Sequence, residues 1–166
     1  WLSILVFFFC SFLGFSQNSS RVLSSENWTF KKVYDSNWFS AKVPGTIHTD
    51  LFQNNLIPDP FFGANEKELQ WIEEEDWLYK TDFQITKDEL ENNIIELNFD
   101  GLDTYATVFL NGKKVLLADN MFRSWKIDVK NQLKIGKNTI EIHFESASKK
   151  GEEESQKLSY TLPEKE

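Results

Sequence analysis

The stretch GLDTYATVFLNGKKV, residues 101–115, restricts the possible folds of this chain more than any other segment. Its run of β-forming residues ends at Asn111-Gly112, and these residue types best tolerate the positive φ angles of a two-residue hairpin turn. The pattern therefore predicts a β-hairpin with a first strand over 104–110. Apolar residues occupy both faces of that strand, so we expect it to be central in its sheet and covered on both sides.

Other segments show the period-two alternation of strands that have one buried and one solvated face. They are 77–85, 93–99, 123–129 and 139–145, with 28–33 and 38–43 as weaker candidates. Gly136-Lys137-Asn138 is expected to form a turn before the last strand. Thr86 and Glu89 have the spacing of a capping box, which predicts one helical turn. Short strands at this spacing predict an all-β domain built as an antiparallel sandwich or jelly roll.

The segment 44–76 interrupts the strand pattern. It holds three of the four prolines and shows little alternation, and we expect helical turns within 46–55 and 65–76. After about residue 147 the alternation gives way to a charged surface segment, 148–166. Long irregular segments inside a domain often carry function or form an interface, so the candidate functional residues are sought mainly in 44–76.

The first 15 residues, WLSILVFFFCSFLGF, are apolar throughout. This run is shorter than the roughly 20 residues that span a bilayer, and it matches the apolar part of a secretory signal peptide, which we place at 1–16. A buried core helix is the alternative, but the run has no polar face. Without an initial Met or a basic start, the chain is expected to lack its own beginning. Cys10 is the only cysteine, so a cleaved protein would have no disulfide.

The charge of the chain argues against two classes of partner. The formal net charge is −8 and the isoelectric point is about 4.9. A surface this acidic repels phosphate backbones and anionic lipids. We therefore expect no nucleic-acid partner, and no membrane insertion once the signal has been removed.

Few residues offer catalytic chemistry. His48 and His143 are the only histidines and have no neighbours at metal-ligand spacing. We expect His143 to be solvated, and His48 to cap or hydrogen-bond a loop. The acidic run 73–76 lies between Trp71 and Trp77, and a glycosidase needs paired carboxylates. A solvated acidic face is the simpler explanation, because four neighbouring carboxylates do not define an acid and a nucleophile at a fixed separation.

Three long motifs add a family resemblance. They are VPGTIHTDLFQNNLIPDPFFGANEKELQWIEEEDWLYKTDF (43–83), FDGLDTYATVFLNGKKV (99–115) and DNMFRSWKIDV (119–129). From about residue 28 to residue 144, the chain resembles the N-terminal region of the β-mannosidases of glycoside hydrolase family 2. The resemblance is weaker to the β-galactosidase and β-glucuronidase branches. It implies a galactose-binding-like jelly roll over 17–147 that is incomplete at the C-terminus, with its final strands and a catalytic (β/α)₈ barrel beyond residue 166.

The resemblance also implies an activity for the whole enzyme. Such enzymes release terminal, non-reducing β-D-mannose by a retaining mechanism that uses two glutamates of the barrel. No metal or organic cofactor is implied, and no catalytic residue is assigned in this chain. The implied partners are a β-mannoside oligosaccharide or glycoprotein glycan and the downstream domains of the same polypeptide. With a signal peptide, the expected location is the secretory pathway: periplasmic or extracellular in a bacterium, lysosomal in an animal.

Our hypothesis for the contribution of this chain concerns the irregular segments 58–63, 68–76 and 120–123. We expect them to face the catalytic domain and to help wall its pocket. The candidate pocket or interface residues are Phe61, Phe62, Trp71, Asp76, Asn120 and Arg123. The strand 104–110 is expected to be scaffold, and Asp103 and Thr104 to fix its entry through side-chain-to-backbone hydrogen bonds.

Two other functions fit a jelly roll, because a fold alone does not define an activity. One is a stand-alone carbohydrate-binding module that holds a polysaccharide without cleaving it. The other is a purely structural adhesion domain, which leaves the motif match unexplained. A reading frame that continues into a barrel would favour the enzyme, and a stop codon near residue 166 would favour the module.

Overall fold

The computed structural model describes residues 20–23 and 26–158 of the chain. The predicted signal peptide and Cys10 lie outside the described residues, as does the segment 159–166. Within the described part, no helix has the length and apolar content needed to cross a bilayer.

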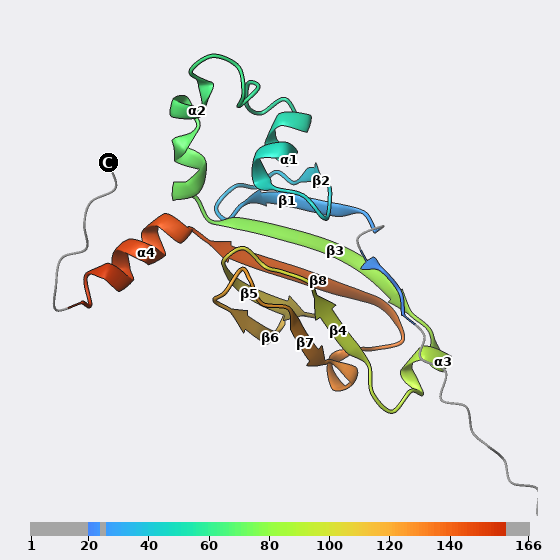
Figure 1. Ribbon diagram of the computed structural model, residues 1–166. Coiled ribbons are helices and arrows are strands. Elements are labelled where there is room, and N and C mark those ends of the chain that lie inside the picture. Colours follow the sequence, from blue (N-terminus) through green and yellow to red (C-terminus); the bar gives the residue numbers. More distant parts are fainter. Residues whose placement is uncertain (1–19, 24–25, 159–166) are drawn as a thin grey trace, which may run out of the picture.

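Six antiparallel strands form the main sheet in the order β2-β1-β3-β8-β5-β6, and β4 and β7 pair separately as a two-stranded ribbon (Figure 1). The strands are β1 (Trp28–Lys32), β2 (Phe39–Ala41), β3 (Trp77–Ile85), β4 (Glu96–Phe99), β5 (Tyr105–Leu110), β6 (Lys113–Ala118), β7 (Trp125–Asp128) and β8 (Gly136–Glu145). The helical pieces are α1 (Ile47–Gln53), α2 (Asn65–Glu68), η2 (Gln70–Glu74), α3 (Lys87–Leu90), η3 (Lys130–Gln132) and α4 (Ala147–Ser155). The predicted all-β, antiparallel class is confirmed.

The predicted Asn-Gly hairpin is present between β5 and β6. Asn111 has φ 52° and Gly112 has φ 78°, the positive angles that this turn requires. The pairing shifts between Val108 and Phe109, because Val108 lies opposite Leu116 whereas Phe109 lies opposite Lys114. One residue of β6 therefore bulges out of the ladder.

One expectation about the chain near β8 is wrong. Gly136, with φ 87°, opens β8 rather than forming a turn before it, and the strand is paired with β3 from that residue onward. The glycine lets the chain bend sharply while it keeps the strand pairing. The segment after residue 146 is charged and mostly exposed as expected, but residues 147–155 form helix α4, whose N-cap is Ser146.

The main sheet buries one of its two faces. Phe30, Tyr79, Ile142 and Val108 are successive partners across β1, β3, β8 and β5, so their side chains lie on the same face. Two different structures cover this buried face, one over each half of the sheet.

The β4–β7 ribbon covers the half formed by β8, β5 and β6 together with the far end of β3. The buried side chains beneath it are mostly aliphatic. They include Phe83, Ile85, Ala106, Val108, Leu110, Ile140 and Ile142, and Leu97, Phe99, Trp125 and Ile127 of the ribbon pack against them. This half is a conventional two-layer sandwich.

The segment 44–76 covers the other half, next to β1 and β2, with α1, α2 and η2 (Figure 1). The predicted helical turns are confirmed. The capping box that begins α1 is formed by Thr46 and Thr49. Asp50 of α1 is fully buried, and its carboxylate accepts hydrogen bonds from the Lys42 amide at 2.9 Å and from the Tyr79 hydroxyl at 2.8 Å. Burial, and secondarily the bond to Asp50, raises the pKa of Tyr79.

The opposite face of the sheet is open. One row of partners across it consists of Thr29, Lys80, Glu141, Phe109 and Lys114, and four of these five are polar or charged. The expectation that β5 is covered on both sides is therefore wrong for its second face, because Tyr105, Thr107 and Phe109 are only half-buried there. β5 is also second from the edge of the sheet rather than central.

Candidate functional site

Several of the sequence-predicted site residues lie at one end of the sandwich. Trp77, Phe144, Ala106 and Ala118 are aligned across β3, β8, β5 and β6, so the residues just before β3 and just after β6 lie at the same end. Asp76 and the segment 120–123 therefore share this end. The strands next to them, β3 and β6, lie three strand spacings apart in the sheet, which corresponds to roughly 14 Å.

Asp76 anchors the chain at this end. Its carboxylate accepts a 2.7 Å hydrogen bond from the Ser146 amide, and its carbonyl oxygen accepts one from the Val33 amide at 3.0 Å. The Ser146 hydroxyl donates to the Glu73 carbonyl oxygen at 2.5 Å. The end of β8 is thereby tied to η2 and to the start of β3. Asp76 is thus half-buried and held by structural contacts, whereas Glu73 and Glu74 of the same acidic run are exposed, as a solvated face requires.

Trp71 lies on η2 beside this anchor and is 36% exposed. Its ring centroid is 6.3 Å from that of Trp77, and the Lys32 ammonium lies 4.2 Å from the Trp71 ring centroid. The same ammonium pairs with the Glu75 carboxylate at 3.1 Å. A cation held against the aromatic face fixes the orientation of the ring and leaves part of it accessible.

Phe61 and Phe62 project from the loop between α1 and α2. They are 97% and 74% exposed, respectively, which is unusual for two adjacent phenylalanines. Asp59 braces the loop: its carboxylate accepts from the Phe61 amide at 2.9 Å, and its carbonyl oxygen accepts from the Asn65 side chain at 2.8 Å. The loop thus displays two aromatic rings on a hydrogen-bonded frame.

The segment 120–123 forms the connection between β6 and β7. Asn120 stabilises it, because its side-chain oxygen accepts from the Phe122 amide at 2.9 Å. The Arg123 guanidinium lies 4.3 Å from the Trp125 ring centroid. Sequence reasoning selected Asn120 and Arg123 but not Phe122, which is 90% exposed between them. An aromatic residue in a segment without alternation was the signal that could have identified it.

The remaining polar candidates are ordinary structural groups. His143 is half-buried, with its Nε2 atom 4.0 Å from an Asp76 carboxylate oxygen, and is therefore less solvated than expected. His48 is exposed on α1, where Thr46 rather than His48 supplies the cap. The Thr104 hydroxyl donates to the Asp103 carboxylate, so the expected bonds from these two side chains to the backbone are replaced by one between them. In residues 20–23 and 26–158, no three His, Cys, Asp or Glu side chains gather as a metal ion would require.

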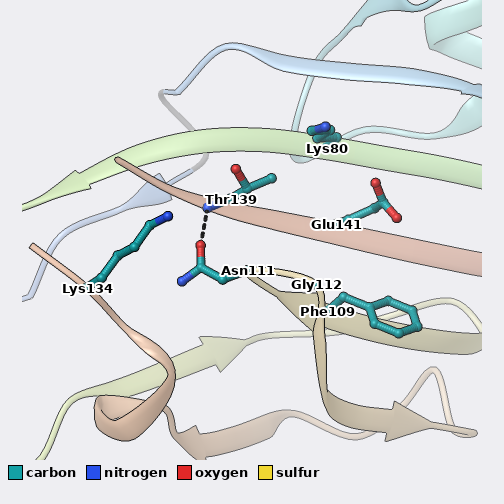
Figure 2. Close-up of a pocket in the computed structure, with 7 residues that line it drawn as sticks. All are labelled: Lys80, Phe109, Asn111, Gly112, Lys134, Thr139 and Glu141. Carbon is teal, nitrogen blue, oxygen red and sulfur yellow. Dashed lines mark hydrogen bonds between the residues drawn. The ribbon is translucent and has the colours of Figure 1, made fainter. Parts of the chain in front are cut away.

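A second feature lies on the open face of the sheet and was missed by sequence reasoning. A hollow of about 550 Å³ is lined there by residues of β3, β5 and β8, the β5–β6 turn and Lys134. In Figure 2, Phe109 and Glu141 lie near each other, and Lys134 lies across Asn111 and Thr139 from them. The sequence pattern predicts that Phe109 is covered, so only the three-dimensional arrangement reveals this site.

Comparison with known proteins defines the family. The model of the family described as "Glycosyl hydrolase 2 galactose-binding domain-like" matches residues 28–166. The chain belongs to this glycosyl hydrolase 2 family. Similar curated proteins include "Beta-mannosidase B" of Emericella nidulans, 40% identical over 128 residues, and "Probable beta-mannosidase" of Caenorhabditis elegans, 34% identical over 142 residues.

Solved structures of glycosyl hydrolases share the fold. The β-D-mannosidase of Dictyoglomus thermophilum matches with a TM-score of 0.81 and 47% identity, over 82% of this chain and 17% of that one. The β-D-glucuronidase of the same organism matches with a TM-score of 0.55 and 20% identity, over 72% of this chain and 18% of that one. The second likeness is one of fold alone.

The glycosyl hydrolase 2 match concerns one domain of larger proteins. The alignments cover 74% and 82% of this chain but only 15% and 16% of the Emericella and Caenorhabditis proteins. The chain therefore spans roughly a sixth of the length of the relatives that it matches. The regular sandwich and the candidate residues described above are features of that domain.

Proposed function

We propose that this chain is the N-terminal, non-catalytic domain of an exo-β-mannosidase. In the proposed enzyme, terminal non-reducing β-D-mannose is released from an oligosaccharide or glycoprotein glycan by a retaining mechanism with two carboxylates. Those carboxylates belong to a domain outside this chain, and the mechanism requires no metal or organic cofactor. The role of this chain is to support the catalytic domain and to shape access to its pocket.

One observation carries the choice of activity. Two enzymes from the same organism share this fold, yet this chain is 47% identical to the β-D-mannosidase and only 20% identical to the β-D-glucuronidase. Because the fold is common to both, the higher sequence identity to the mannosidase is what favours a β-mannosidase.

The activity is tested with the full-length gene product. It should release nitrophenol from p-nitrophenyl β-D-mannopyranoside much faster than from the corresponding β-galactoside or β-glucuronide. The 166-residue chain alone, used as a control, should release none. Mannoside cleavage by the short chain, or a full-length product that prefers another glycoside, would contradict the proposal.

The pocket role rests on the exposed aromatic residues at the end of the sandwich and on the α1–α2 loop. Replacing Phe61, Phe62 or Trp71 with Ala in the full-length enzyme should lower kcat/KM or weaken domain docking, because these rings would lose contact with the catalytic domain. Ile94→Ala is the control, since Ile94 is 64% exposed and precedes β4 at the opposite end of the sandwich. Wild-type kinetics and thermal stability in all three aromatic variants would refute this role.

We also propose that the protein enters the secretory pathway. The support is the apolar run at the start of the sequence, which fits a signal peptide. N-terminal sequencing of the mature protein from its native host should then begin near residue 17. A mature protein that retains the apolar run would argue against secretion.

A further inference from the structure

The hollow on the open face of the sheet has a rigid polar floor. The Asn111 side-chain amide donates to the Gln132 carbonyl oxygen and to the Asn138 side-chain oxygen, each at 2.8 Å. Its side-chain oxygen accepts from the Thr139 amide at 3.1 Å (Figure 2). The Thr139 hydroxyl in turn donates to Asp82 at 2.5 Å. These groups are occupied by one another, so they shape the floor without competing for a ligand.

The walls of the hollow, in contrast, carry polar groups that the fold leaves available. Glu141 lies directly opposite both Lys80 and Phe109 in the sheet register. Within the described part of the chain, neither the Glu141 carboxylate nor the Lys134 ammonium takes part in an ion pair. The Lys80 ammonium is held 5.6 Å from the centroid of the Trp38 ring. A free acceptor, Glu141, thus lies opposite the half-buried ring of Phe109, and a free donor, Lys134, lies on the other side of the hollow.

This combination matches a neutral saccharide better than other ligands. The face of an aromatic ring carries partial negative charge, which attracts the C–H groups of a sugar ring, while a carboxylate and an ammonium can accept from and donate to hydroxyls. An apolar ligand would leave the charged walls without partners, and an anion could pair with a lysine but would leave the Glu141 carboxylate without a donor. The volume of about 550 Å³ lies within the range of small-molecule sites.

We propose that this hollow is a saccharide-binding site, and that it holds one or two units of a neutral polysaccharide or oligosaccharide. Phe109 supplies the stacking surface, and Glu141 and Lys134 hydrogen-bond the hydroxyls. The hollow lies on the open face of the sheet, whereas Phe61, Phe62 and Trp71 belong to the segment that covers the opposite face. The inference that this hollow binds a saccharide does not depend on the proposed function. Only the choice of a mannan as the probe in the experiment below rests on it.

The test is affinity electrophoresis of the full-length protein in gels that contain soluble β-1,4-linked galactomannan. Phe109→Ala should raise the dissociation constant about tenfold, because an aromatic contact of this kind is lost. Glu141→Gln should raise it about threefold, because the amide keeps one acceptor oxygen but loses the charge. Phe52→Ala is the matched control, since Phe52 is half-exposed on α1 at the covered side of the sheet, and its retention should equal that of the wild type.

Each outcome has one meaning. Wild-type retention of both Phe109→Ala and Glu141→Gln overturns the site, as does an equal loss in Phe52→Ala. The Glu141→Gln variant is nearly isosteric, so its result stands even if Phe109→Ala fails to fold. A different result would be retention only in gels that contain polygalacturonate, an anionic polysaccharide, together with loss of that retention when Lys134 is replaced. This result would overturn the assignment to a neutral saccharide. A full-length protein that shows Phe109-dependent retention but hydrolyses no mannoside would support this site and refute the proposed function.

Discussion

The β4–β7 ribbon and the segment 44–76 cover two halves of the same sheet face, but they are held there by different kinds of contact. Beneath the β4–β7 ribbon, the contacts are mostly aliphatic and follow the strand period, so many positions share the packing. Beneath the helical segment 44–76, the sheet contributes mainly aromatic side chains, with 5.7 Å between the ring centroids of Phe30 and Tyr79, and the contacts include the buried carboxylate of Asp50. The ribbon-covered half therefore depends on burial that repeats with the strand period, whereas the helix-covered half depends on a few individual contacts and hydrogen bonds.

The largest effect is expected from a cavity in the ribbon-covered half. Leu110→Ala removes a fully buried side chain of β5 and should lower the free energy of unfolding by about 2–5 kcal/mol. Hydrogen exchange followed by mass spectrometry should show reduced protection throughout β5 and β8. Leu117→Ala, on the exposed side of the same hairpin, should change stability by no more than about 0.5 kcal/mol. Equal effects in the two variants would mean that β5 is not a core strand.

A smaller and more local effect is expected in the helical half. Tyr79→Phe removes the hydroxyl that donates to Asp50 and leaves a buried carboxylate oxygen without that partner, which should cost about 1–3 kcal/mol. Protection should fall in α1 while β5 remains as in the wild type. Tyr105→Phe, on the open face, serves as the control. A loss spread evenly over both halves would show that the two coverings unfold together and that the comparison fails.

The smallest effect on stability is expected on the open face of the sheet, from the carboxylate of Asp82. A hydrogen bond from Lys137, followed by one from Thr139, lowers the pKa of Asp82. Because the folded-state pKa lies below the unfolded value of about 3.9, this stabilisation is complete above about pH 4 and disappears as the pH falls through the lowered folded value. The difference between the thermal unfolding temperatures of the wild type and Asp82→Asn should therefore shrink as the pH falls below about 4. A constant difference between pH 7 and pH 3 would contradict the assignment.

The sandwich half was largely predictable from the sequence, because alternation and the Asn-Gly turn are local signals. The covering of β5 was misjudged, because Phe109 and Val108 look alike in a one-dimensional pattern although only one of them faces the core. Gly136 was misread as a turn because a glycine with positive φ can also open a strand. The aromatic residues of 58–63 and 120–123 were located by composition alone, and only the structure shows how fully Phe61 and Phe122 are exposed. The hollow depends on residues from four separate segments, so no local pattern could indicate it.

The bulge at Val115 bears on how this sheet meets other molecules. A free strand at the border of a sheet is a template onto which another chain can add and begin fibril growth. At β6 the extra residue breaks the repeat of main-chain donors and acceptors, and Lys113 and Lys114 place two positive charges beside it. The other border, β2, offers only three residues. Both borders of the main sheet are therefore poor templates for the addition of another chain.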